Sequence, residues 1–298
     1  MNIKAFRIIS GNAFKIFSAK DPLRTAAATA FFTTFSLPAI LLILIEVIGV
    51  FYNPAIVRKG IFSQLLGVIG KESTVKIYRI LNQFLKLSQN WFTAVAGFIF
   101  LIFVVTTLFG VVRNSINEMW NVDVDRKSGL KFYLQLRLKS TLIICFSGIV
   151  LTIQLIASAL QLLSSNYLHE AWGNNNSFLY KLVSQLIFII IASGWFSILF
   201  RYLANAHPDW RTAGIGGIFT GILFTIGKLI LSALLTFDTL KEVFGKSGAL
   251  VLILLFVFYS SFIFYYGAAF TKALVDHRHK KMILDKHAFR YVVKKVKS

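Results

Sequence analysis

Residues 248–271 read GALVLILLFVFYSSFIFYYGAAFT and contain no charged side chain. A helix needs about 20 residues to cross a hydrocarbon layer ~30 Å thick, whereas a helix in a soluble core seldom stays uncharged for that length. Other apolar runs of spanning length come earlier in the chain. The sequence therefore predicts an all-α, polytopic membrane protein with six transmembrane helices, the first five from the runs 26–52, 91–112, 140–163, 182–200 and 212–236.

Charged residues are almost entirely excluded from these runs. The chain has 32 Lys and Arg and 12 Asp and Glu, and only Glu46 and Lys228 fall inside a run. With 56% hydrophobic residues and a mean hydropathy of +0.70, the 298 residues leave too little polar sequence for a soluble domain. We expect an amphipathic helix at 1–25, the transmembrane domain at 26–272 and a basic tail at 273–298.

The distribution of positive charge predicts how the chain is oriented. The two termini and the connections predicted to lie on their side of the membrane carry 22 Lys and Arg, and the opposite side carries 9. The positive-inside rule therefore places both termini in the cytoplasm. We attribute the net charge of +20 to this topology and to anionic lipid headgroups, because no soluble stretch interleaves basic and aromatic residues as RNA-binding segments do. Membrane lipids are the expected partners and nucleic acid is not; the sequence predicts no oligomeric state.

Three polar segments carry apolar stripes at helical spacing. The connection 53–90 has two such stripes, which predict two short amphipathic helices on the outer side, and residues 1–25 predict a helix on the cytoplasmic surface. In the tail, Leu284, Ala288 and later apolar residues predict a second surface helix. Within the first span, Pro38 removes one backbone hydrogen bond and predicts a kink.

Glu46 and Lys228 are the candidate path residues, because an ionisable side chain inside a membrane span usually faces the bundle interior, a partner or water. They lie ~9 Å and ~12 Å before the outer ends of their helices, which is close enough in depth for pairing. One interpretation is a charge pair on the wall of a translocation cavity. The other is that both side chains snorkel to the outer interface.

A second candidate site lies on the cytoplasmic side. Arg113, Asn117 and Trp120 continue the second span as a helix and share one face through their i, i+4, i+7 spacing. The planar fork of an arginine suits phosphate or carboxylate, so an anionic headgroup site is one interpretation. The alternative is positive-inside residues with an aromatic interface anchor. The candidate residues are Arg113, Asn114, Asn117, Trp120, Arg201 and Arg211.

Signatures of enzymatic chemistry are missing from the sequence. It has no Walker loop, no HExxH, no GxSxG and no pair of acids within a span. The single cysteine, Cys145, lies in an apolar run, and the histidines at 277 and 279 lie in the basic tail, which indicates a solvated run of charges and not a metal site. We therefore expect a protein that is not an enzyme and has no cofactor or metal.

Several segments together resemble the YihY or BrkB family of bacterial inner-membrane proteins over about residues 20–275. The last span also resembles that family, except that Gly267, Ala268 and Ala269 stand where its members usually have Gly-Ala-Glu. A mechanism that needs this carboxylate, such as proton coupling, is therefore not expected. The other segments that carry the resemblance are AAATAFFTTFSLPAILLIL (26–44), RNSINEMWNV (113–122), and PDWR (208–211) followed by GIGGIFTGILFTIGKLIL (214–231).

The resemblance implies a six-helix protein of the bacterial inner (plasma) membrane. The family has carried a ribonuclease label and a virulence or serum-resistance label. A kinked first span, buried charges and surface helices favour a transporter or flippase-like protein for an amphipathic or anionic lipid-like solute. The alternative is a non-transporting scaffold that organises the envelope, and a ribonuclease or lipid-modifying enzyme is a distant third. Substrate, direction and coupling ion cannot be read from the sequence.

Overall fold

The computed structural model describes residues 2–49, 53–87, 91–125, 146, 150, 177–235 and 248–292. In this part of the chain the long elements are all helices. Four strands of two or three residues lie in the segments between or after the helices and form two antiparallel pairs. The helices are α1 (Ile3–Ser18), α2 (Pro22–Gly49), α3 (Pro54–Leu87), α4 (Trp91–Met119), α6 (Ser177–Tyr202), α7 (Trp210–Leu235) and α9 (Gly248–His277), and the strands are β1 (Val122–Val124), β2 (Ala206–His207), β3 (Ile283–Leu284) and β4 (Ala288–Arg290).

The prediction of a helical membrane protein is confirmed. The prediction that it has six transmembrane helices is not confirmed. Every predicted apolar run except 140–163 falls largely within a described helix, and that run lies outside the described residues apart from Phe146 and Val150. Within the described ranges, three helical segments are long and apolar enough to cross a membrane. They are Gln185–Tyr202, Trp210–Leu231 and Leu250–His277.

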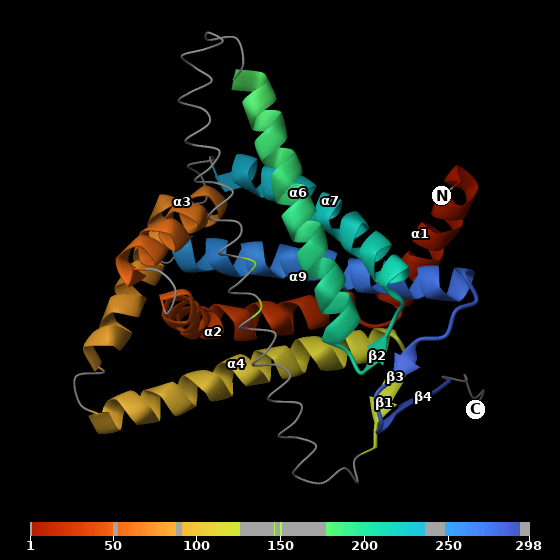
Figure 1. Cartoon of the computed structure of the whole chain (residues 1–298), viewed down its shortest axis with the longest axis horizontal. Helices are drawn as coiled ribbons and strands as arrows, with labels where there is room; N and C mark the ends of the chain where they lie inside the picture. Colours follow the sequence, from red (N-terminus) through yellow and green to blue (C-terminus); the bar gives the residue numbers. More distant parts are fainter. Residues whose placement is uncertain are drawn as a thin grey trace.

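Helix α9 is the central element of the bundle. Its 30 residues give a length of ~45 Å, and it packs against α1, α2 and α7 (Figure 1). Helix α4 packs on the side of α2, and α6 packs on α7. Helix α1 buries Ile9 and Ala13 in a cluster with Phe270, Ala273 and Leu274 of α9, so the predicted N-terminal helix is present. Its contact with a membrane surface stays a prediction.

Small residues hold α6 and α7 close together. Gly217 and Gly221 are four residues apart on α7, opposite Ser193 and Ser197 on α6. A Cβ atom added at Gly217 would lie 2.0 Å from the Ser197 hydroxyl oxygen and 2.5 Å from the Ser193 carbonyl oxygen. Only glycine allows this approach, which is typical of helices that pack within membranes.

The prediction of two short outer helices at 53–90 is wrong. The segment forms one helix of 34 residues, α3, which begins at Pro54 after Asn53 caps it by accepting a hydrogen bond from the Ala55 amide at 2.9 Å. Ile61, Ile77 and Leu81 are buried in a cluster with residues of α2 and α9. Both predicted apolar stripes therefore belong to a single helix, which buries part of each stripe against the bundle.

The predicted surface helix in the basic tail is also wrong. Helix α9 ends at His277, and His279 has a φ of 51°, which turns the chain out of the helix. The tail then forms β3, which pairs with β2, and β4, which pairs with β1. The stripe that begins with Leu284 and Ala288 fits helical spacing, but pairing with distant strands overrides this local preference. Residues 293–298 lie outside the described residues.

These strand pairs gather at one end of the bundle, which we call the strand end. Here α4 ends at Met119, α6 ends at Tyr202, α7 begins at Trp210 and α9 ends at His277 (Figure 1). This is the end that the charge distribution predicts to be cytoplasmic. The C-terminal segment therefore connects the segment after α4 and the loop between α6 and α7 through backbone hydrogen bonds.

Candidate functional site

Lys228 is the cation that lies deepest along α7. It comes 18 residues after Trp210, the first residue of the helix, which corresponds to ~27 Å along the axis. The side chain is half-buried, and its Nζ lies 4.1 Å from the centroid of the Phe188 ring on α6. An ammonium group over an aromatic face is attracted by the ring quadrupole, and the attraction grows when water is excluded.

Aromatic rings pack around this part of α7. Phe188 stacks on Phe224 of α7 with ring centroids 6.3 Å apart, and Gly227 allows Tyr259 of α9 to approach, because a Cβ there would lie 2.1 Å from the tyrosine ring. Among the residues that the structure describes, no carboxylate lies within ion-pair distance of the Lys228 ammonium. This apolar, aromatic setting could receive an anionic group that brings its own negative charge.

The predicted pair between Glu46 and Lys228 stays a prediction. The backbone of Glu46 belongs to α2, but its side chain lies outside the described residues. Helix α2 continues through Pro38 to Gly49, so the proline does not end it. The Pro38 side chain is likewise not described, and the kink stays a prediction.

A buried polar network lies at the strand end. The Asn117 side chain on α4 donates from Nδ2 to the Asn205 side-chain oxygen at 2.7 Å, and its own oxygen accepts from the Asn205 backbone amide at 2.9 Å. Asn205 Nδ2 in turn donates to an oxygen of Asp285 at 3.1 Å. Asn117 and Asn205 are 94% and 99% buried, respectively, so these bonds satisfy polar groups that have no access to water.

Asp285 joins the tail to this network. Its second carboxylate oxygen lies 2.8 Å from His207 Nε2, and its backbone amide donates to the Asn205 carbonyl at 2.9 Å. The guanidinium of Arg113, buried on α4, is attracted electrostatically by the same carboxylate. Asp285 therefore connects α4 and the loop between α6 and α7 to the C-terminal segment.

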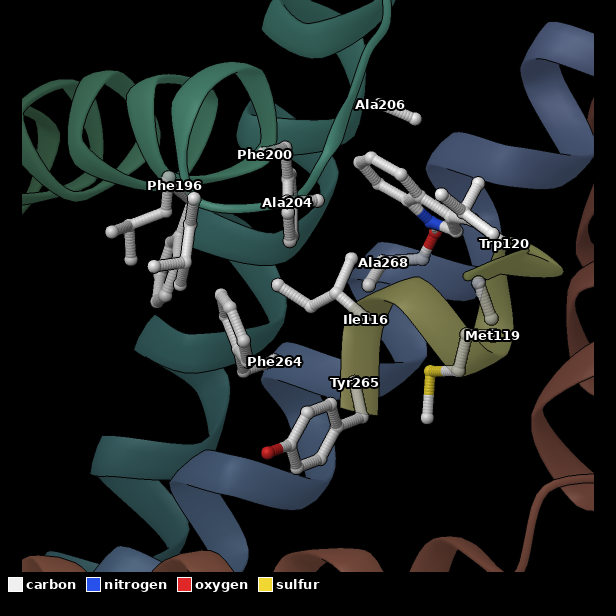
Figure 2. Close-up of a cluster of buried hydrophobic side chains, with 14 of the residues drawn as sticks. Ile116, Met119, Trp120, Phe196, Phe200, Ala204, Ala206, Phe264, Tyr265 and Ala268 are labelled. Carbon is white, nitrogen blue, oxygen red and sulfur yellow. Dashed lines mark hydrogen bonds between the residues drawn. The ribbon is translucent and has the colours of Figure 1, made fainter. Parts of the chain in front are cut away.

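Trp120 lies on the same face of α4 as Asn117 but bonds to α9. Its ring is fully buried, and its Nε1 donates to the Ala268 carbonyl oxygen of α9 at 2.9 Å. Figure 2 shows the indole nitrogen pointing at that carbonyl, among Ile116 of α4 and Phe200 of α6. A fully buried tryptophan in this position ties α4 to α9 and is not an anchor in the membrane interface.

The residues of the predicted headgroup site do not lie on one surface. Arg113, Asn117 and Trp120 share a buried helix face, as their spacing predicts, whereas Asn114 is exposed to one side of that face. Arg211 is exposed at the start of α7. Half-buried Arg201 donates to the Pro208 carbonyl oxygen and lies 5.8 Å from the Trp210 ring centroid.

The start of α7 is fixed by Asp209. Its carboxylate accepts from the Thr212 hydroxyl at 2.5 Å and forms an ion pair of 2.9 Å with Lys280 of the tail. Burial raises the pKa of this carboxyl. The hydrogen bonds from Thr212 and Lys280 and the positive charges of Lys280 and Arg278 lower it by more than burial raises it, so the pKa is below its usual value. The charged form of Asp209 is thus the one that the strand end stabilises.

Three residues of the network were not predicted as site residues. Asn205 and His207 lie in a loop and Asp285 lies in the tail, about 80 residues apart in the sequence. The signal available was the polar residues Asn205 and His207 in the short connection between two apolar runs, and an acidic residue, Asp285, in a tail rich in Lys and Arg. An exposed aromatic pair was also missed: the rings of Tyr202 and Trp210 are 5.7 Å apart, a composition typical of membrane interfaces.

Comparison with known proteins identifies relatives described as UPF0761 membrane proteins. The one from Psychrobacter sp. is 25% identical over 257 residues, which cover 85% of this chain and 45% of that protein. The one from Teredinibacter turnerae is 24% identical over 281 residues, covering 92% and 62% of the two chains, and the one from Saccharophagus degradans is 23% identical over 270 residues, covering 89% and 59%. The chain therefore spans about half to three-fifths of the length of these relatives.

No solved structure matches this chain. The profile of the family Virulence factor BrkB matches residues 13–290, a range that contains Lys228, Trp120 and the polar network of the strand end. This match covers nearly the whole chain and agrees with the apolar helices and with relatives that are named as membrane proteins. The chain is a membrane protein that belongs to the Virulence factor BrkB family, also known as the YihY or BrkB family.

Proposed function

We propose that the protein moves or flips an amphipathic, anionic, lipid-like solute across the bacterial inner membrane, without catalysing a chemical reaction. Both termini and the strand end lie in the cytoplasm in this proposal. The observation that carries it is the position of Lys228, a half-buried cation far along an apolar helix and against an aromatic ring.

The energetics of Lys228 support a role in a path. A lysine within a membrane helix costs at most about 2.5–3.5 kcal/mol, the value on insertion scales for the helix centre, and a single cation–π contact returns about 0.5–2 kcal/mol. Within the described residues, no ion pair supplies the difference. The phosphate of a lipid that passes this point would supply it, because a desolvated ammonium binds an anion more strongly than one in water does.

The packing of α7 supports different roles for the two halves of the helix. Towards the strand end, Gly217 and Gly221 lock α7 against α6. The solute path would run beside the other half, which carries Lys228. At the strand end, exposed Arg211 and the pair of Tyr202 and Trp210 would meet the headgroup of the solute before it enters.

The experiment is lipid movement in reconstituted vesicles. The full chain is placed in liposomes that contain phosphatidylglycerol with a fluorescent headgroup or acyl chain, and dithionite added outside bleaches the label as it reaches the outer leaflet. We expect the wild-type protein to accelerate bleaching and Lys228→Met to reduce the rate about tenfold, which corresponds to one lost charge contact of about 1.4 kcal/mol. Lys71→Met, which removes an exposed lysine of α3, is the matched control and should leave the rate unchanged.

Two results would contradict the proposal. If wild-type vesicles bleach no faster than protein-free vesicles under several ion gradients, the protein does not move such lipids, and a scaffold becomes the better interpretation. If Lys228→Met and Lys71→Met move lipid equally fast, the protein moves lipid but Lys228 is not part of the path.

A further inference from the structure

A second polar side chain, that of Gln185, lies in the same part of the bundle as Lys228. Gln185 precedes Phe188 on α6 by three residues, so the two side chains share one face of the helix, about one turn apart. Phe188 is the ring that lies 4.1 Å from the Lys228 ammonium. Gln185 also comes 17 residues before Tyr202, the end of α6, which corresponds to ~26 Å along the axis. Its depth from the strand end therefore matches that of Lys228, ~27 Å along α7.

Tyr259 brings a third polar group to this depth. It lies on α9, 18 residues before His277 at the end of the helix, which corresponds to ~27 Å. A Cβ added at Gly227 would lie 2.8 Å from the Tyr259 hydroxyl oxygen, so this hydroxyl lies against α7 next to the lysine. The three helices involved contain the three apolar segments of spanning length. We call Gln185, Lys228 and Tyr259 the donor layer.

The hydrogen-bonding groups of the donor layer are mostly donors. A lysine ammonium offers three donors and no acceptor, a glutamine amide nitrogen offers two donors, and a tyrosine hydroxyl offers one. The Nε2 atom of Gln185 is shielded from solvent and has no hydrogen-bond partner in the part of the chain that the structure describes. A buried donor without a partner destabilises the protein. An acceptor that enters the donor layer is therefore stabilised there.

A phosphodiester is the acceptor that matches this geometry. It carries a negative charge and four oxygens around a tetrahedral phosphorus, so donors on three different helices can each reach an oxygen. A carboxylate presents two oxygens in one plane, which suits a planar fork better than separate donors. Beside the layer, α7 exposes the apolar side chains of Ile226 and Leu229, which suit acyl chains. These features favour a phospholipid over a fatty acid or a free phosphate ion.

We propose that the donor layer binds the phosphate of one glycerophospholipid, whose acyl chains lie along the exposed apolar surface of α7. This inference rests on the proposed function. It names the class of lipid and adds Gln185 and Tyr259 as residues that recognise it. In the alternative interpretation, Gln185 only joins helices through a hydrogen bond.

The experiment is equilibrium binding of radiolabelled phosphatidylglycerol to the detergent-solubilised full chain, measured by scintillation proximity with unlabelled competitors. We expect diacylglycerol and oleate to compete about tenfold or more weakly than phosphatidylglycerol, because diacylglycerol lacks the charged acceptor and oleate offers only a carboxylate. Inorganic phosphate lacks acyl chains and should not compete at millimolar concentration. Competition by inorganic phosphate, or by oleate as strongly as by phosphatidylglycerol, would overturn the assignment to a phospholipid.

Variants test the two new residues. Gln185→Leu and Tyr259→Phe should each weaken binding of phosphatidylglycerol about tenfold, the scale of one hydrogen bond to a charged group. Gln83→Leu, which removes an exposed glutamine of α3, is the matched control and should bind as the wild type does. In lipid-free detergent, Gln185→Leu should keep the wild-type thermal midpoint, because the amide nitrogen that it removes has no described partner. A lower midpoint with unchanged binding would support the helix-joining role and overturn the proposal.

Binding and lipid movement have separate readouts. If vesicles with the wild-type protein move lipid while Gln185→Leu and Tyr259→Phe bind phosphatidylglycerol normally, this inference fails and the proposed function stands. If the vesicles move no lipid but these variants lose binding, the lipid site stands and the proposed function fails.

Discussion

The contact between α6 and α7 makes a sharp prediction for Gly217. Changing Gly217 to Ala adds a Cβ that would lie 2.0 Å from the Ser197 hydroxyl, 2.5 Å from the Ser193 carbonyl oxygen and 2.6 Å from the Ser197 backbone nitrogen. The hydroxyl can rotate away, but the two backbone atoms cannot. The helices must therefore separate by about 1 Å to restore ordinary van der Waals distances.

The magnitude follows from comparison with Gly214 on the same helix. A Cβ at Gly214 meets nothing within 4 Å, so Gly214→Ala gains only the helix propensity of alanine, about 1 kcal/mol. Gly217→Ala gains the same propensity and also incurs overpacking, which costs about 1–3 kcal/mol. The difference between the two variants isolates the packing cost, because the propensity gain is common to both.

The assay is the thermal midpoint of detergent-solubilised protein, followed by fluorescence-detected size exclusion after heating. At about 2–4 °C per kcal/mol for a domain of this size, Gly217→Ala should melt several degrees below Gly214→Ala. Equal midpoints would refute the close packing of α6 on α7, and with it the rigid half of α7 that the proposed path requires.

Further predictions concern the strand end. Trp120→Phe should lower the free energy of unfolding by about 1–3 kcal/mol, because the bond to the Ala268 carbonyl is lost and a small cavity remains; the same melting assay checks it. Asn117→Ala should cost about 2–3 kcal/mol, since Asn205 loses two buried partners, and a wild-type midpoint would contradict it. The pKa of Asp209 is lowered in the folded protein, so its contribution to stability is present above about pH 4 and lost as pH falls further. The thermal midpoint of Asp209→Asn should therefore fall less than that of the wild type when the pH is lowered below about 4.

Periodicity and charge exclusion were enough to predict a helical membrane protein, and three of the described helical segments are long and apolar enough to cross a membrane. The apolar runs are so long that no soluble helix competes, and the described helices follow them. The face shared by Arg113, Asn117 and Trp120 was likewise predicted from i, i+4, i+7 spacing, because a helix fixes side-chain direction.

The same reasoning failed where tertiary contacts replaced local preference. The tail was predicted to be a helix from its apolar spacing, but β3 and β4 find partners in β2 and β1, far away in the sequence. The network of Asn205, His207 and Asp285 could not be predicted for the same reason. Nothing in the local sequence says that a loop residue and a tail residue will meet in the interior.

The central claim is that Lys228 lines the path of an anionic solute, so that a charged molecule can reach this position. The most direct measurement is the reaction of a charged, membrane-impermeant thiol reagent with Lys228→Cys, in a chain whose native Cys145 is replaced by Ser. Leu229→Cys, at the neighbouring position that is 57% exposed on the apolar helix surface, is the matched control. The account predicts that the cysteine at 228 reacts much faster than the one at 229 in lipid vesicles; equally slow reaction at both positions would mean a dry bundle and would contradict it.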